Sequence, residues 1–176
     1  FDLDLDAIPN TFDATTKVIF LCTPNNPTGN LLSRDKAIEV LKRFYGLVVI
    51  HEAYIDFAKR KRFLHVLKKH PNLVVLQTFS KAWGLAGLRL GVCYASEEII
   101  SILNKIKYPY NVNIRTQELA LDALENAYRK DIWVDEILKG RDLVARELKY
   151  LPLVDKIFPT DSNFLLVRVK DAQSTY

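Results

Sequence analysis

The 176-residue sequence contains no methionine, only two cysteines and only three histidines. Cys22 and Cys93 lie in separate apolar runs without a CxxC pair, so we read them as small buried side chains and not as a disulfide framework. His51, His65 and His70 lack the spacing of zinc ligands, and we predict no metal site. No apolar run approaches the roughly 20 residues that cross a bilayer, which argues against a membrane partner.

The ends of the sequence bear on the expected location of the protein and on whether the chain is whole. Residues 1–6 alternate acidic and apolar side chains, unlike a secretory signal peptide, so we expect a cytoplasmic protein. The initiating methionine is absent, and residues 172–176 follow directly on a strand-like run. We therefore expect the chain to be a fragment of a longer protein.

Charge is mixed along the chain, and the net charge is only +4. Much of the excess is local, in residues 59–62 with Lys68 and Lys69 nearby. Because this patch lacks interleaved aromatic side chains that stack on bases, we interpret it as a solvated loop and helix face and expect no nucleic-acid partner. DNA binding is kept as an alternative that salt-dependent affinity would reveal.

Four apolar runs predict buried strands, at residues 17–22, 47–50, 73–77 and 90–95. Residues 33–45 lie between the first two and predict an amphipathic helix with Ser33 as its N-cap. Residues 63–69 predict a shorter helical stretch. A strand–helix–strand unit implies neighbouring parallel strands. The predicted fold class is therefore α/β, with a mostly parallel open sheet that is flanked by helices and covered on both faces.

After Ser96 the pattern becomes helical. Three helices are predicted, at residues 97–106, 114–128 and 131–150, with Gly140 as a candidate break point in the last. Residues predicted to face inward from the second helix are Leu119, Ala120, Ala123, Leu124 and Ala127. Two short strands follow, one between Pro152 and Pro159 and one at residues 163–169, which indicates the beginning of a small second domain.

Polar residues follow three of the predicted strands. The first strand leads into Thr23-Pro24-Asn25-Asn26-Pro27-Thr28-Gly29, the second into His51-Glu52-Ala53-Tyr54, and the third into Thr78-Phe79-Ser80-Lys81. Each could be an ordinary turn. Together they indicate a ligand site, because the carboxyl ends of parallel strands meet at one edge of the sheet.

Lys81 is the most informative residue at this edge. Two hydroxyls, Thr78 and Ser80, precede it, and a glycine-containing turn and Arg89 follow. An amine can form an imine with an aldehyde, while hydroxyls and a guanidinium hold a phosphate. A phosphorylated aldehyde fits this set, whereas a lone lysine in a polar turn would be an ordinary surface residue.

These motifs, in this order and at these separations, resemble those of fold-type-I pyridoxal-phosphate-dependent aminotransferases. The segments that carry the resemblance are 24–29, 52–57, 78–89 and 108–113. The amino-acid sequences of these segments are most similar to those of the histidinol-phosphate aminotransferases. This resemblance implies transfer of an amino group between L-histidinol phosphate and 2-oxoglutarate in histidine biosynthesis. It also implies that residues 1–130 are part of the cofactor-binding large domain, and that residues 131–176 are a connecting helix and the beginning of the small C-terminal domain.

The resemblance assigns roles to individual residues. Lys81 would be the catalytic residue that forms the imine with pyridoxal phosphate and moves the proton. Asn26 and Tyr54 would hydrogen-bond the phenolic oxygen of the cofactor. Its phosphate would be bound by Thr78, Ser80 and Arg89, above a tight turn made possible by Gly84 and Gly87.

His51 departs from the family pattern, which has aspartate at this position. The aspartate keeps the pyridine nitrogen protonated, and a neutral histidine can accept one hydrogen bond from that nitrogen but lends no negative charge. We therefore expect slow transamination. The family also completes its site with a dimer partner, so a homodimer is expected. A decarboxylase of threonine phosphate and a non-catalytic module of the same fold, serving binding or dimerisation, are the alternatives.

Overall fold

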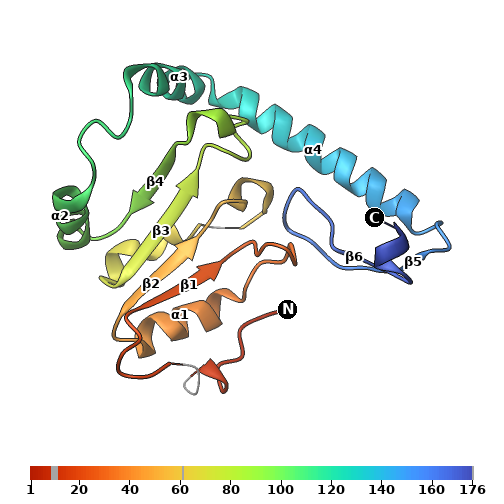
Figure 1. Ribbon diagram of the computed structural model, residues 1–176, viewed down its shortest axis with the longest axis horizontal. Helices are drawn as coiled ribbons and strands as arrows, with labels where there is room; N and C mark the ends of the chain where they lie inside the picture. The colour runs from red at the N-terminus through yellow and green to blue at the C-terminus, as the bar shows by residue number, and fades with distance from the viewer. Residues whose placement is uncertain (9–11, 61, 176) are drawn as a thin grey trace.

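The computed structural model describes residues 1–8, 12–60 and 62–175. It contains a four-stranded sheet in the order β1-β2-β3-β4 and a separate two-stranded sheet, β5-β6 (Figure 1). The strands of the larger sheet are β1 (Val18–Cys22), β2 (Leu47–His51), β3 (Leu73–Thr78) and β4 (Gly91–Tyr94). The smaller sheet pairs β5 (Val154–Ile157) with β6 (Val167–Val169) in antiparallel fashion.

The larger sheet is mostly parallel, which confirms the predicted α/β class. β1, β2 and β3 run in the same direction, with Cys22 opposite His51 and His51 opposite Leu76. β4 pairs with β3 in the opposite sense. The carboxyl ends of β1, β2 and β3 therefore point to one side, toward the segment between α4 and β6 (Figure 1).

Helix α1 (Arg34–Arg43) connects β1 to β2 and covers one face of the sheet (Figure 1). It begins as predicted, since the Ser33 hydroxyl accepts a hydrogen bond from the Lys36 N–H. Its buried side chains Ala37, Val40 and Leu41 pack into the main core with the buried residues of β2 and β3. The short helical stretch of Phe63–Lys69 (η3) is present as a 3₁₀ helix. Two further 3₁₀ turns occur at Ile55–Phe57 (η2) and Ala86–Leu88 (η4).

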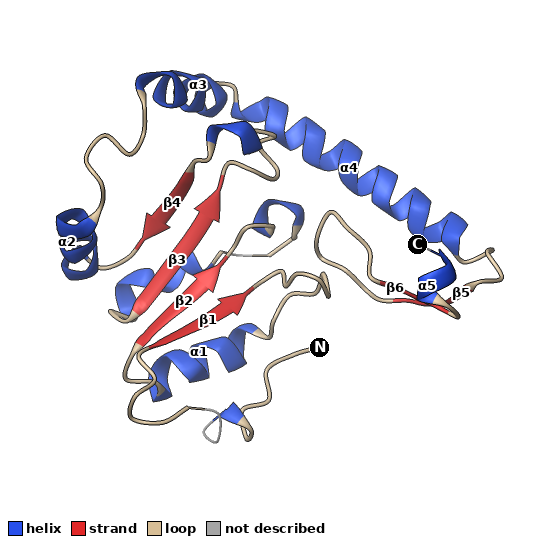
Figure 2. Cartoon of the chain, viewed as in Figure 1, coloured by secondary structure: helices blue, strands red, loops and turns tan. Residues whose placement is uncertain are grey.

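The later helices are α2 (Glu97–Ile106), α3 (Ile114–Glu125), α4 (Ala127–Leu148) and the short α5 (Ala172–Thr175) (Figure 2). The expected break near Gly140 is wrong, since α4 runs through it without interruption. A glycine inside a helix is only about 1 kcal/mol less favourable than an alanine. The 22-residue helix α4 remains continuous despite this cost. The boundary between α3 and α4, predicted at residues 129–130, falls at Asn126, whose amide donates back to the Asp122 carbonyl.

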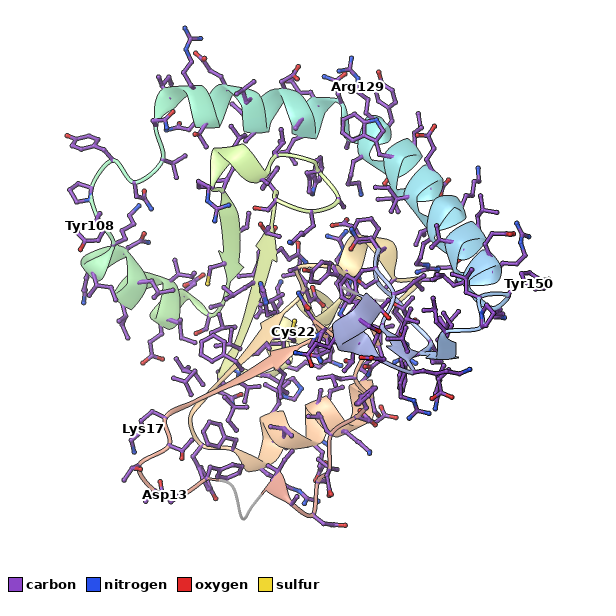
Figure 3. All side chains as sticks on the ribbon, turned by 45° about the vertical axis from the view of Figure 1, so that its right-hand side comes forward. Asp13, Lys17, Cys22, Tyr108, Arg129 and Tyr150 are labelled. Carbon is purple, nitrogen blue, oxygen red and sulfur yellow. The ribbon has the colours of Figure 1, made fainter. Side chains whose placement is uncertain are left out.

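Apolar side chains are exposed where we predicted burial. Leu119 and Leu124 of α3 are each 50% exposed. The buried residues of this helix are Thr116 and Ala120, so Ala120 is the one residue of the predicted inward face that is buried. Phe20 of β1 is 69% exposed, so the expectation that both faces of the strands are covered is wrong at this edge. Tyrosines such as Tyr108 and Tyr150 project into solvent at opposite sides of the molecule (Figure 3).

Within the described ranges, no helix combines the length and the apolar character that crossing a bilayer needs.

The loop before β6 returns to the larger sheet and packs against the loop after β1. The Asp161 N–H donates to the Gly29 carbonyl at 2.8 Å, and the Leu31 N–H donates to the Asp161 carboxylate at 2.8 Å. Gly29 has a φ of 77°, and a Cβ atom there would lie 2.3 Å from the Thr160 hydroxyl oxygen. Glycine is therefore required at this position, both for its backbone conformation and for the close approach of Thr160.

Candidate functional site

Asn26 and Tyr54 meet at the carboxyl edge of the sheet. Asn26 lies in the loop after β1, and Tyr54 follows β2 by three residues. The Asn26 amide donates a hydrogen bond to the Tyr54 hydroxyl oxygen at 3.1 Å. Because the hydroxyl accepts this bond, its own proton remains available for an oxygen atom of a ligand.

The loop that carries Asn26 is held by its own backbone and by a buried hydroxyl. The Gly29 N–H donates to the Asn25 carbonyl at 2.7 Å, and the Asn25 N–H donates to the Asn30 carbonyl at 2.9 Å. Thr23 is almost fully buried, and its hydroxyl accepts the Leu32 N–H. The peptide bonds before Pro24 and Pro27 are cis.

Tyr54 is buried, and its ring is fixed from two sides. Phe164, from the loop before β6, packs edge-on against it, with ring centroids 5.1 Å apart. The Lys81 Nζ atom lies 5.2 Å from the centroid of the Tyr54 ring, within the range of a cation–π interaction. The structure therefore brings together three predicted site residues, the amine of Lys81, the phenol of Tyr54 and the amide of Asn26.

Lys81 lies just beyond β3, at the beginning of a tight turn. The Gly84 N–H donates to the Lys81 carbonyl at 2.9 Å, and Gly84 has a φ of 66°, as its predicted role requires. Gly87 does not share that role. Its φ is not positive, and a Cβ atom there would meet open space, so the prediction that the turn depends on Gly87 is wrong. The Lys81 side chain is exposed, hence accessible to a ligand.

The predicted phosphate-binding residues are only partly assembled. The Ser80 N–H donates to the Thr78 hydroxyl at 3.0 Å, so the two hydroxyl residues form one turn. Arg89 adjoins this turn through its neighbour Leu90, whose carbonyl accepts the Phe79 N–H at 3.1 Å. The Arg89 guanidinium is exposed and donates to the Ala86 carbonyl at 3.0 Å. Its role in binding a phosphate stays a prediction.

His51 ends β2 beside the same group of residues and is half-buried. The pKa of His51 is lowered, mainly because burial disfavours the charged imidazolium and secondarily because Lys81 repels it. Its Nδ1 atom lies 3.7 Å from the Cys22 sulfur. An imidazole with a pKa below its usual value of about 6.5 is neutral at pH 7.

Glu52 belongs to the polar segment that the sequence predicted at this edge, but its burial and its partners were not anticipated. It is 1% exposed and accepts the Phe63 N–H at 2.6 Å and the Gln77 amide at 2.8 Å. It thereby fixes the beginning of η3 against β3. An acidic residue directly after an apolar strand was the available signal, but the sequence gives no indication of its partners.

A second polar network ties α4 to the segment after β2. The Asp56 carboxylate forms two ion pairs, one with the Arg62 guanidinium at 2.7 Å and one with the Nζ atom of Lys130 in α4 at 3.2 Å. Arg62 also reaches the Gln77 side-chain oxygen at 3.3 Å. The interpretation of residues 59–62 as a purely solvated patch is therefore wrong at Arg62, and Lys61 lies outside the described residues.

A metal centre finds no support in the described part of the chain. No group of three or more histidine, cysteine, aspartate or glutamate side chains there could hold an ion. What the site offers is a primary amine, a phenol with a free proton, an amide and two hydroxyls. Such a set suits covalent capture of a carbonyl carbon with hydrogen bonds to a neighbouring oxygen.

The electrostatic coupling between Lys81 and His51 predicts a measurable change. In the variant Lys81→Met the pKa of His51 should rise, because the repelling charge is gone, but should stay below about 6.5 because burial is the larger cause. Titration of the imidazole by NMR measures this. Lys68→Met, an exposed position on η3, is the control and should leave the titration unchanged. An unchanged pKa in Lys81→Met would show that the two groups are not coupled, and a lower pKa would contradict the repulsion between them.

Comparison with known proteins places the chain in a family. The sequence profile of "Aminotransferase class I and II" matches residues 1–175. The chain is 56% identical over 176 residues to a histidinol-phosphate aminotransferase from Cytophaga hutchinsonii and 52% identical to one from Parabacteroides distasonis. All of the chain matches 51% of each relative, so it spans about half of their length.

A solved structure shows the same fold. The histidinol-phosphate aminotransferase from Clostridium acetobutylicum superimposes with a TM-score of 0.87 at 25% identity, over 96% of this chain and 52% of that protein. The sheet, the strand-end loops and the profile match agree, and the chain belongs to the class I and II aminotransferase family.

Proposed function

We propose that the protein containing this chain is a pyridoxal-phosphate-dependent aminotransferase that exchanges an amino group between L-histidinol phosphate and 2-oxoglutarate in histidine biosynthesis. The observation that carries the proposal is the approach of the Lys81 amine to the Tyr54 ring while Tyr54 is hydrogen-bonded to Asn26. The names of the relatives support the choice of substrate.

Apart from Arg89, whose guanidinium donates to the Ala86 carbonyl and is not assembled with Thr78 and Ser80, the residues present fit the cofactor at all but one position. Lys81 is the catalytic residue, and its exposed amine is free to bond the aldehyde carbon. Tyr54 retains a proton for the phenolic oxygen, and Asn26 fixes the orientation of the phenol. Thr78, Ser80 and Arg89 bind the phosphate group. The bound cofactor supplies an electron sink for the carbon that loses its proton.

The position that fits less well is His51. A carboxylate there would stabilise a positive charge on the pyridine nitrogen, and an ion pair at about 4 Å is worth about 4 kcal/mol at an effective dielectric constant of about 20. The neutral His51 lends no such charge. The proposal therefore includes a slow proton-transfer step and a ring nitrogen that loses its proton more easily than beside a carboxylate.

We further propose a cytoplasmic homodimer acting on small molecules, without a nucleic-acid or membrane partner. Exposed apolar side chains on α2 and α3, such as Ile102, Ile106 and Leu121, support association with another chain. Cys22 and Cys93 are free thiols, which suits a reducing compartment. Residues 1–130 are proposed as part of the large domain, and residues 131–176 as the connecting helix and the beginning of the small domain.

Trapping with borohydride tests the proposal directly. With pyridoxal phosphate added, reduction should fix the cofactor on Lys81, which peptide mass spectrometry identifies. The variant Lys81→Ala should lose this label, while Lys68→Ala, the matched control, should keep it. A chain that is not labelled at Lys81 would instead support a non-catalytic module of the same fold.

Replacement of His51 tests the proposal that this residue slows proton transfer because it lends no charge to the ring nitrogen. His51→Asp should raise the pKa of the cofactor's ring nitrogen by about three units, the equivalent of about 4 kcal/mol, and should speed proton transfer by orders of magnitude. The ¹⁵N chemical shift of labelled cofactor reports the ring nitrogen, and stopped-flow absorbance reports the rate. His65→Asp, on η3, is the control. Equal shifts and equal rates in His51→Asp and the parent chain would refute this account of His51.

A further inference from the structure

The contact between Cys22 and His51 is not used by any role assigned above. These residues end neighbouring parallel strands and lie opposite each other in the register. The Cys22 Sγ atom lies 3.7 Å from His51 Nδ1, a distance at which sulfur can take part in a hydrogen bond. The sulfur therefore faces one specific nitrogen of the ring.

The proton of the Cys22 thiol is already engaged elsewhere. Burial raises the pKa of Cys22, so the group is a protonated thiol at neutral pH. It donates to the Pro24 carbonyl at 3.3 Å, and a carbonyl oxygen can only accept. The lone pairs of the sulfur remain for donors, and one of these is the backbone N–H of Asn26.

This arrangement determines which nitrogen of His51 carries the hydrogen. A neutral imidazole has one N–H group and one acceptor nitrogen. Because the thiol proton is directed to Pro24, Nδ1 faces sulfur lone pairs and is the nitrogen that donates. Nε2 is then the unprotonated acceptor of the ring.

We infer that Cys22 is a positioning residue, which holds His51 as the Nδ1–H tautomer so that Nε2 accepts a hydrogen bond from the protonated ring nitrogen of the bound cofactor. The second half of this inference rests on the proposed function. In place of the charge of a carboxylate, the site then offers an oriented neutral acceptor, and the same sulfur anchors the loop that carries Asn26.

The tautomer is measured without cofactor, by ¹⁵N NMR of the histidine-labelled chain at pH 8, where His51 is neutral. The parent chain should show a protonated Nδ1 and an unprotonated Nε2. Cys22→Ala should shift His51 toward the Nε2–H form that free imidazole favours, whereas Cys22→Ser, which keeps a donor and an acceptor, should restore Nδ1–H. Cys93→Ala, in β4, is the matched control and should resemble the parent.

Two results would overturn the tautomer assignment. One is an Nε2–H form in the parent chain, a result that needs no variant to fold. The other is an unchanged His51 spectrum in a folded Cys22→Ala chain. Either result would leave the trapping of Lys81 untouched, so it is distinguishable from a failure of the proposed function.

The role toward the cofactor is measured by titration with pyridoxal phosphate. Losing one oriented hydrogen bond should weaken binding about three- to tenfold in Cys22→Ala, and Cys22→Ser should recover most of that loss. Equal affinity of Cys22→Ala and the parent would overturn this role. A parent chain with the Nδ1–H form but no labelled Lys81 would overturn the proposed function, and with it the role of Nε2, while the tautomer assignment would stand.

Discussion

The parallel alignment of β1, β2 and β3 is the constraint on which the site depends. Each strand is pinned to the next in register, so the three loops that follow must emerge at one edge of the sheet. Asn26, Tyr54 and Lys81 come from three different loops, and none of them could reach the others if one strand were reversed. The apolar packing of α1 against β2 and β3 stabilises this alignment, and the chemistry of the edge follows from it.

The edge is also closed from outside the sheet. Gly29 lets Thr160 and Asp161 approach the loop after β1, and Phe164 packs against the ring of Tyr54. The segment before β6 therefore stabilises the phenol and the amide loop together. This contact spans more than 100 residues of sequence, and it makes the geometry of the site depend on the C-terminal part of the chain.

Much of this could be predicted from the sequence because the signals are local. The apolar runs marked the strands, Ser33 marked the start of α1, and the polar residues after three strands marked the edge. What failed depends on tertiary context. Whether Leu119 is buried depends on which surface lies opposite α3, and no helical periodicity carries that information. The partners of Glu52 and the contact of Phe164 with Tyr54 are likewise set by distant segments.

The electrostatics of the edge explain why His51 and Lys81 are best considered together. Burial and a neighbouring amine both favour a neutral imidazole at His51, so under the proposed function the cofactor would meet a neutral group at this position. The central claim, however, is that Asn26 and Tyr54 act as one unit on one ligand. A double-mutant cycle of Asn26→Ala and Tyr54→Phe on the dissociation constant of pyridoxal phosphate tests it most directly. Groups in contact couple by about 0.5–3 kcal/mol, so the double variant should lose less affinity than the two single losses combined. Strictly additive losses would contradict the account.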